Sequence, residues 1–323
     1  MDRLRLGTRG SELALFQANA VAALLSERAG MSCEIVVIKT SGDRMAEASL
    51  AQIGGKRLFV KEIEDALLNG DVDVAVHSSK DMPASLPDGL KVGAVLPRED
   101  PHDAIVLPGD QRRTLSMTEA VSALGRQPRI GTSSIRRVAQ LIRLFPDARF
   151  LPVRGNLGTR LRKLDAGDYD VLVLAAAGLR RLARADRIVT TVPVDACVPA
   201  PGQGIIAVEV RQDDSRVHNA VSTIDDPTSA VALRAERAVV TRLGGGCQMP
   251  IGALADVSAQ EVTVRGVVVS PDGSRLVRAT AVAPTADAEG LGARVAEELL
   301  RGGADEILAD VQRAHAAVEG IQP

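Results

Sequence analysis

Two short sequence patterns each occur twice, in the same order, and this duplication constrains the fold more than any other feature of the chain. The pattern RLGT at 5–8 is echoed by RIGT at 129–132. The pattern GDVDVAV at 70–76 is echoed by GDYDVLV at 167–173, with five of the seven positions identical. In both longer copies a glycine suited to a helix C-cap precedes an apolar, β-branched run typical of a buried parallel strand. The duplication predicts two α/β domains of similar winding.

The sequence around these copies extends the prediction. Helical stretches at 59–69 and 159–166 precede the two glycines. Proline-containing segments at 96–101 and 199–204 lie on either side of the second copy and predict two crossings between the domains. On this interpretation the strand-like run at 205–210 returns to the first domain.

The last hundred residues differ in kind. Asp226 and Pro227 predict the N-cap and first turn of a helix that ends near Leu243. After it the pattern predicts two strands and then two helices, at 262–269, 275–282, 286–300 and 305–318. From residue 251 onward there are eleven acidic and six basic residues, so this part is not expected to bind an anion.

We therefore predict an α/β protein with two similar doubly wound domains and a small C-terminal α+β domain. The first domain is expected to comprise residues 1–100 and 200–220, the second 101–199, and the third 221–323. No run approaches 18 uncharged apolar residues, so no membrane span is expected, and the charged N-terminal residues favour a cytoplasmic protein.

Charge is distributed unevenly along the chain. The net charge is −2, yet residues 126–181 contain twelve basic and four acidic side chains. This surplus indicates an anionic partner. Aromatic residues are only 2% of the chain, which argues against nucleic-acid recognition by base stacking. Three scattered cysteines are too few for a disulfide framework or a zinc site, so free thiols and no metal are expected.

Three stretches combine glycines, hydroxyls and arginines where α/β domains bind ligands, at the ends of strands and the starts of helices. They are residues 131–137, 154–160 and 179–181. Their arginine forks suit carboxylates or phosphates. Solvated helix faces are the alternative interpretation of any single arginine among them.

The segment 77–83 follows the first strand copy. Asp81 beside Lys80 at such a position can keep its charge, hydrogen-bond a substrate N–H group and stabilise a developing cation. A purely structural loop is the alternative. His77 is interpreted as a hydrogen-bonded strand-end histidine and is left out of the site.

Cys247 lies in a glycine-rich loop directly after a predicted helix, where exposure favours reactivity. It is a candidate for covalent attachment, although most free cysteines are inert small hydrophobic residues, which describes Cys33 and Cys197 better. No paired histidine accompanies Cys247 in the sequence, so a protease-like mechanism is not supported.

Taken together, these residues closely resemble the porphobilinogen deaminases, also called hydroxymethylbilane synthases. The resemblance runs the whole length of the chain and is carried by GTRGS, GGKRLFVKE, VHSSKDMP, GTSSIRR, RGNLGTR and GGCQMPIG, at 7–11, 54–62, 76–83, 131–137, 154–160 and 245–252. It implies that the first two domains are of the type II periplasmic-binding-protein kind. It also implies a transferase that joins four porphobilinogen molecules into hydroxymethylbilane, with loss of ammonia, in tetrapyrrole (haem) biosynthesis.

The resemblance also implies roles for single residues. Cys247 matches the cysteine that holds a dipyrromethane cofactor through a thioether, and Asp81 matches the catalytic aspartate. Positions that bind the acetate and propionate groups of cofactor and chain are matched by Lys80, Thr132, Ser133, Ser134, Arg136, Arg137 and Arg154, and, for the substrate, by Arg9, Ser11, Arg160 and Arg181. Lys56 matches a mobile loop over the cleft. Ser79, where Met or Leu is common, and Pro201 depart from the pattern without touching this chemistry.

Two rival functions stay open at this point. The two-lobed architecture also fits a solute-binding module without catalysis, which the reactive-looking cysteine and the missing signal peptide oppose. The arginine-rich segment also fits an RNA- or DNA-binding protein, which the scarcity of aromatics and the negative net charge oppose. A monomer is expected, because no long apolar helix stripe stands out.

Overall fold

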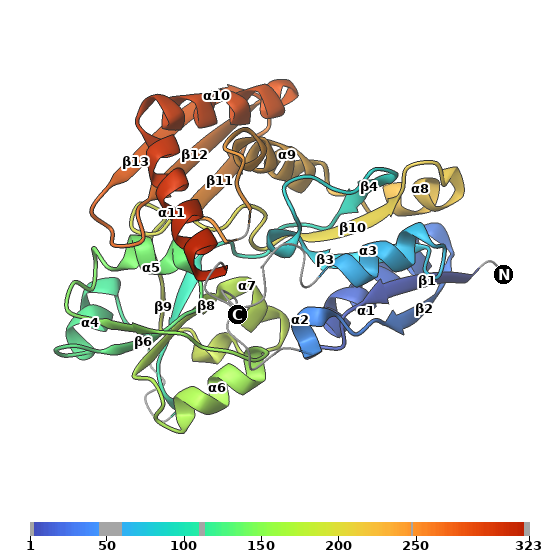
Figure 1. Cartoon of the computed structure of the whole chain (residues 1–323). Coiled ribbons are helices and arrows are strands. Elements are labelled where there is room, and N and C mark those ends of the chain that lie inside the picture. The colour runs from blue at the N-terminus through green and yellow to red at the C-terminus, as the bar shows by residue number, and fades with distance from the viewer. Residues whose placement is uncertain (1–2, 45–59, 110–113, 247, 320–323) are drawn as a thin grey trace.

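The computed structural model describes residues 3–44, 60–109, 114–246 and 248–319, and it arranges them as two α/β parts and one smaller part (Figure 1). Each α/β part contains a five-stranded sheet, and the smaller C-terminal part contains a three-stranded sheet covered by helices. The expected α/β fold with a small C-terminal α+β domain is confirmed. No helix among the described residues is long and apolar enough to cross a membrane.

The first sheet has the strand order β2-β1-β3-β10-β4. The strands are β1 (Arg3–Thr8), β2 (Ser32–Val37), β3 (Val74–Ser78), β4 (Leu90–Val95) and β10 (Ile206–Arg211). β1 runs parallel to β2 and β3, whereas β10 runs antiparallel to β3 and β4. The strand expected at 205–210 is therefore part of the sheet formed by the N-terminal residues.

The second sheet repeats this arrangement in the order β7-β6-β8-β5-β9. Its strands are β5 (Asp103–Val106), β6 (Arg129–Gly131), β7 (Arg149–Leu151), β8 (Val171–Ala175) and β9 (Thr190–Thr191). β6 runs parallel to β7 and β8, and β5 runs antiparallel to β8 and β9. The domain boundaries given above stay a prediction.

Both sheets are mixed, and the two duplicated runs expected to form parallel strands each have one parallel neighbour. β3 and β8, the strands of the duplicated pattern, are parallel to one neighbour and antiparallel to the other. The antiparallel neighbour in each case is the strand that follows a crossing, β10 or β5. A chain that arrives from the other sheet enters from the opposite end, so its strand runs in the opposite direction.

The duplicated patterns contact each other in the same way in both sheets. Asp73 accepts hydrogen bonds from the backbone N–H of Arg5 at 2.9 Å and from its Nη2 at 2.8 Å. Asp170 accepts the equivalent bonds from Arg129 at 2.7 and 2.6 Å. The arginine of the first pattern and the aspartate of the second therefore form one structural unit, present once in each sheet.

In the described part of the chain, eight helices belong to the two larger parts: α1 (Glu12–Ala29), α2 (Ser41–Arg44), α3 (Lys61–Leu68), α4 (Met117–Ala123), α5 (Ile135–Leu141), α6 (Leu157–Asp165), α7 (Ala176–Arg181) and α8 (Ser215–Ser222). α3 and α6 are the helices expected before the duplicated strands. α6 begins two residues before the predicted start, because Asn156 caps it by accepting the N–H of Thr159 at 2.9 Å. The glycine after each helix, Gly70 or Gly167, has a positive φ of 76° or 85°, as the C-cap interpretation requires.

The C-terminal part contains α9 (Pro227–Arg242), β11 (Ile251–Val257), β12 (Glu261–Val269), β13 (Leu276–Pro284), α10 (Ala288–Arg301) and α11 (Ala304–Glu319). Asp226 caps α9 by accepting the Ser229 N–H at 2.7 Å, as predicted. The sequence analysis missed β11, whose glycine and two alanines have low strand propensity. Its first five residues are buried, so packing against α9 compensates for that propensity.

The two crossings between the sheets are held to the C-terminal part by one buried carboxylate. Glu236 of α9 pairs with Arg98 Nη1 of the first crossing at 2.6 Å and accepts the N–H of Gly202 in the second at 2.6 Å. It also accepts the N–H of Ala255 in β11 at 2.8 Å. Glu236 therefore ties all three parts together at the base of the region between the two sheets.

Candidate active site

Asp81 and Lys80 belong to a short 3-10 turn, Ser79–Asp81, that begins where β3 ends. The turn is fixed at its start, because the N–H of Ser79 donates to the carbonyl of Ile205 at 3.0 Å. Ser79 is buried, whereas Lys80 and Asp81 are partly exposed and line a cavity. The end of a central strand thus presents one carboxylate and one ammonium side by side, as the sequence predicted for this loop.

The cavity has a volume of about 580 Å³ and is lined by residues of both α/β parts. Seven of its side chains are basic: Arg9, Lys39, Lys80, Arg137, Arg154, Arg160 and Arg181. Among the described residues that line it, two are acidic, Glu12 and Asp81. The basic surplus predicted for the second domain is therefore partly concentrated in one cavity, where it faces basic groups of the first domain.

Two helices begin at this cavity. Ser11 caps α1 by accepting the Ala14 N–H at 3.3 Å, and both Ser11 and the preceding Arg9 line the cavity. The first residues of α6 line it from the other sheet. Arg160, one turn into α6, donates from Nε to the carbonyl of Gly155 at 2.8 Å. Helix N-termini carry partial positive charge, so both helices add to the preference of the cavity for anions.

The pKa values of three basic groups in the cavity are lowered, mainly because burial disfavours the charged form. Burial lowers the pKa of Lys80 to about 8, with Asp81 acting in the opposite direction and Arg137 adding to the decrease. Burial also lowers the pKa of Arg160 to about 10, and Arg137 again adds to the decrease. Burial alone lowers the pKa of Arg154. Negative groups entering the cavity would reverse these shifts, since they favour the charged forms.

Arg181 completes the cavity near the second crossing. It follows β8 and ends α7, and its Nη2 donates to the carbonyl of Gly204 at 2.6 Å. Burial lowers its pKa, and Glu99 opposes this decrease. Arg181 therefore links a side chain of the second sheet to the backbone of the crossing.

Four predicted ligand-binding residues are not among those that line the cavity. Ser133 Oγ bonds the backbone of Val153, donating to its carbonyl at 2.8 Å and accepting its N–H at 3.0 Å. Ser134 caps α5, and Thr132, which is buried, accepts the N–H of Ser134 at 3.3 Å. Arg136 is buried and points at protein groups. The binding roles implied for these residues stay predictions.

Lys56 and Cys247 lie outside the described residues. Of the cysteines that the structure describes, Cys33 is half-buried and Cys197 is buried, and both are free thiols. His77 is buried and its Nε2 lies 3.0 Å from Glu209 Oε2, in agreement with a hydrogen-bonded strand-end histidine. Within the described ranges, no group of three or more His, Cys, Asp or Glu side chains is arranged to hold a metal ion.

The cavity also contains residues that the sequence analysis did not single out. Gln17 of α1 is buried and its Nε2 donates to Ser78 Oγ at 2.9 Å, beside the turn that contains Lys80 and Asp81. Gly202 and Gly204 of the second crossing line the cavity with φ values of 72° and 89°. A Cβ atom at Gly204 would lie 2.2 Å from the carbonyl oxygen of Glu99. The Gly-x-Gly spacing of the crossing was the one available signal, since it marks close backbone approach.

Comparison with known proteins identifies the family. Two sequence-family models match the chain. The model described as "Porphobilinogen deaminase, dipyromethane cofactor binding domain" matches residues 4–219, and the one described as "Porphobilinogen deaminase, C-terminal domain" matches residues 230–301. A porphobilinogen deaminase of Geobacter metallireducens is 45% identical over 98% of this chain and 97% of its own length. One of Pelotomaculum thermopropionicum is 48% identical over 94% of this chain and 96% of its own.

Solved structures with similar folds include immunogenic lipoprotein A of Vibrio vulnificus, with 14% identity and a TM-score of 0.43 over 70% of this chain and 96% of that one. Substrate binding domain 2 of Lactococcus lactis GlnP has 11% identity and a TM-score of 0.42 over 70% of this chain and 87% of that one. The two family models and the near full-length relatives decide the assignment. The chain belongs to the porphobilinogen deaminase family.

Proposed function

We propose that this chain joins four porphobilinogen molecules head to tail with loss of ammonia, starting from a dipyrromethane group bound to Cys247, and releases hydroxymethylbilane for tetrapyrrole (haem) synthesis. One observation carries the proposal beyond family membership. The turn after β3 presents Asp81 and Lys80 to a cavity in which the basic side chains outnumber the acidic ones by seven to two.

The charge of the cavity matches the chemistry of the substrate. Each porphobilinogen carries two carboxylates, so every unit added to the chain brings two more negative charges. Arginine forks bind carboxylates in a bidentate manner, which fixes orientation as well as position. Arg154 and Arg160 come from the segment 154–160 and Arg9 comes from the opposite sheet, so carboxylates on both sides of a pyrrole can be bound.

Asp81 is the candidate catalytic residue. When the C–N bond of the protonated aminomethyl group breaks, nitrogen leaves as ammonia with the bonding electron pair, and the positive charge passes to the pyrrole. A carboxylate hydrogen-bonded to the pyrrole N–H stabilises that charge. After the new C–C bond forms, the attacked carbon must lose its proton, and the same carboxylate is the candidate base. Glu12, the other acidic residue of the cavity, lies in the first turn of α1.

The residues of the cavity fit a dipyrromethane group, because its four carboxylates need several cationic partners within a space of this size. Lys80, Arg137 and Arg154 would hold it, and the thiol of Cys247 would carry it. When bound, the group supplies the pyrrole carbon to which the first substrate unit becomes bonded. Attachment to Cys247 would make that step effectively intramolecular, which can be worth several kcal/mol.

The test is the intact mass of the purified protein under denaturing conditions. The wild type should be heavier than its chain by two pyrrole units, and so should the matched control Cys33→Ser. Cys247→Ser should have the bare chain mass. If the wild type keeps the bare chain mass after incubation with porphobilinogen, the covalent attachment and the proposed reaction are wrong.

Two further points from the sequence are part of the proposal. A monomeric state is tested by light scattering of the purified enzyme, which should give a mass near 34 kDa. A cytoplasmic location is tested by fractionation of the cells that produce it.

A further inference from the structure

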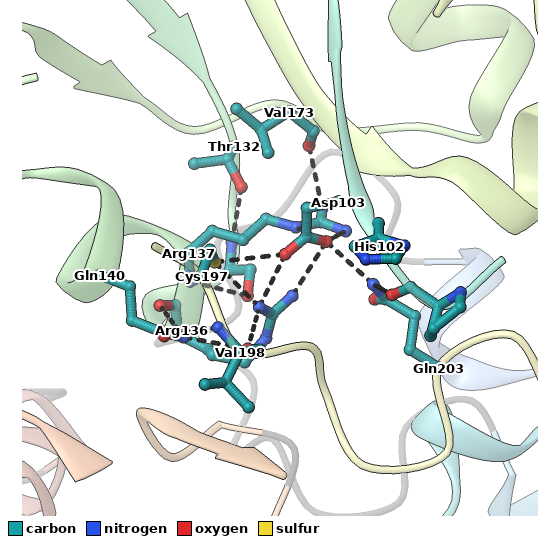
Figure 2. Close-up of polar contacts among 12 residues, drawn as sticks. His102, Asp103, Thr132, Arg136, Arg137, Gln140, Val173, Cys197, Val198 and Gln203 are labelled. Carbon is teal, nitrogen blue, oxygen red and sulfur yellow. Dashed lines mark hydrogen bonds and ion pairs between the residues drawn. The ribbon is translucent and has the colours of Figure 1, made fainter. Parts of the chain in front are cut away.

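Asp103, which the proposed chemistry does not use, lies at the centre of a polar cluster next to the cavity (Figure 2). It is the first residue of β5, and its side chain is fully buried. In the sheet Asp103 pairs with Ala175, a residue that lines the cavity. The carboxylate therefore lies at the end of the sheet where the cavity opens, behind its lining.

Both oxygens of Asp103 accept several hydrogen bonds. Oδ1 accepts from Nε of Arg137 at 2.9 Å and from Nε2 of Gln203 at 3.0 Å. Oδ2 accepts from Nη1 of Arg136 at 2.7 Å and from Sγ of Cys197 at 3.3 Å. Burial raises the pKa of Asp103, but Arg136 and Arg137 outweigh this and hold the pKa far below its usual range. The two guanidinium groups therefore favour the charged form of this buried carboxylate.

The two arginines that share this carboxylate have different surroundings. Arg136 turns to the second crossing, where its Nη1 donates to the carbonyl of Val198 at 2.8 Å, and it does not line the cavity. Arg137 does line the cavity, and its Nη1 donates to the carbonyl of Val173 at 2.9 Å. A guanidinium has five N–H groups, so its contacts to Asp103 and Val173 do not exhaust Arg137.

Gln203 of the second crossing links Asp103 to the first crossing. Gln203, which donates to Asp103, also donates to the carbonyl of Pro101 at 2.6 Å. The carboxylate thus cannot move independently of the backbone around it. A guanidinium that is fixed before the ligand arrives loses less rotamer entropy on binding than a free arginine side chain does.

We propose that Asp103 is a positioning residue for carboxylate recognition: it holds the guanidinium of Arg137 in the orientation that binds a carboxylate of the pyrrole chain. The proposal rests on the proposed function, because porphobilinogen and its products supply those carboxylates. Arg136 has the separate task of joining the same carboxylate to the second crossing. Asp103 also acts through space on Lys80, whose pKa it raises.

The test is a double-mutant cycle on the holoenzyme, with the steady-state rate of porphobilinogen consumption as the assay. Asp103→Asn should lower kcat/KM about tenfold, mainly through KM, because a charge-assisted contact to a carboxylate of the pyrrole chain is weakened. Arg137→Gln should lower it by a similar factor. The double variant should resemble Arg137→Gln within about twofold, since Asp103 acts through Arg137. A purely structural role of Asp103 would instead multiply the two effects, and that result would overturn the proposal.

Asp170→Asn is the matched control. Asp170 also accepts several hydrogen bonds from one arginine, Arg129, but neither residue lines the cavity. The KM of the Asp170→Asn enzyme should stay within about twofold of the wild-type KM. An increase in KM equal to that of Asp103→Asn would contradict the assigned role, because it would show that loss of any such pair has this effect.

Loss of Asp103 leaves two buried guanidinium groups without their carboxylate, which can prevent folding. In that case the same cycle is run in an Arg136→Met background, where only Arg137 remains charged. The expectation and the refuting outcome are the same there. Failure of the proposed function is distinguishable, because wild-type enzyme that consumes no porphobilinogen would exclude the reaction itself, whereas multiplicative effects in an active wild type would exclude only the role of Asp103.

Discussion

Raising the pH through 8 should remove the charge of Lys80 and weaken the binding of pyrrole carboxylates. Lys80 lines the cavity beside Asp81, and burial lowers its pKa from 10.5 to about 8. The group is therefore mainly charged at pH 7 and mainly neutral at pH 9. Only the charged ammonium forms a strong, charge-assisted hydrogen bond to a carboxylate. Binding above pH 8 consequently requires uptake of a proton.

The magnitude follows from this linkage. If only charged Lys80 binds the carboxylate, the apparent Kd grows in proportion to 1 + 10^(pH − pKa), which is about a tenfold increase between pH 7 and pH 9. The same shift acts on stability with the opposite dependence on pH. Between about pH 8 and 10.5 the unfolded chain binds a proton that the folded chain does not, so the free energy of unfolding should rise with pH in this window.

The assay is calorimetric titration of porphobilinogen into the Cys247→Ser variant, which cannot carry a covalently bound anion in the cavity. Lys80→Arg in the same background is the control, because a guanidinium stays charged throughout this range. The Kd of Cys247→Ser is divided by the Kd of the Lys80→Arg double variant at each pH, which cancels the titration of the substrate amine. The ratio should rise about tenfold from pH 7 to pH 9. A ratio that stays constant within about twofold would refute the reasoning.

Three further predictions concern catalysis, elongation and stability. Asp81→Asn should lower turnover about 10²-fold to 10³-fold, because a neutral amide does not stabilise the cation, and it should leave the unfolding midpoint unchanged. Steady-state rates near those of the wild type would exclude the catalytic role. Arg154→Gln and Arg160→Gln should change the distribution of enzyme-bound intermediates in native mass spectra, since each removes a carboxylate ligand from the cavity; an unchanged distribution would count against both assignments. Glu236→Leu should lower the free energy of unfolding in urea by about 3–5 kcal/mol, because a buried ion pair loses one partner. The exposed pair of Glu297 should contribute at most about 1 kcal/mol, so equal losses in Glu297→Leu and Glu236→Leu would show that burial is not the cause.

Local sequence patterns predicted the parts of the fold that depend on neighbouring residues. The duplicated patterns indicated two similar sheets, and the contacts of Asp73 with Arg5 and of Asp170 with Arg129 explain why these short patterns recur together. Capping by Asp226 defined the start of α9 correctly. β11 was missed because its glycine and alanines become strand residues only when α9 and β12 cover them.

The candidate site was predicted in the same uneven way. The loop with Lys80 and Asp81 was found because its charged residues stand at the end of a recognisable strand. The sequence also indicated an anion site rich in arginine, since that depends on composition over a long segment. Asp103 gave no local signal, because its partners Arg136 and Gln203 lie 33 and 100 positions away.

The sequence by itself determined the fold class, the family and the position of the turn with Lys80 and Asp81, because each is encoded in contiguous residues. The tertiary structure alone decided which arginine enters the cavity. Arg136 and Arg137 are adjacent in the chain, but successive residues of a helix point about 100° apart, so they face different surroundings. Arg137 reaches the cavity and Arg136 is buried against the second crossing, because only the packing of α5 between Asp103 and that crossing distinguishes the two directions.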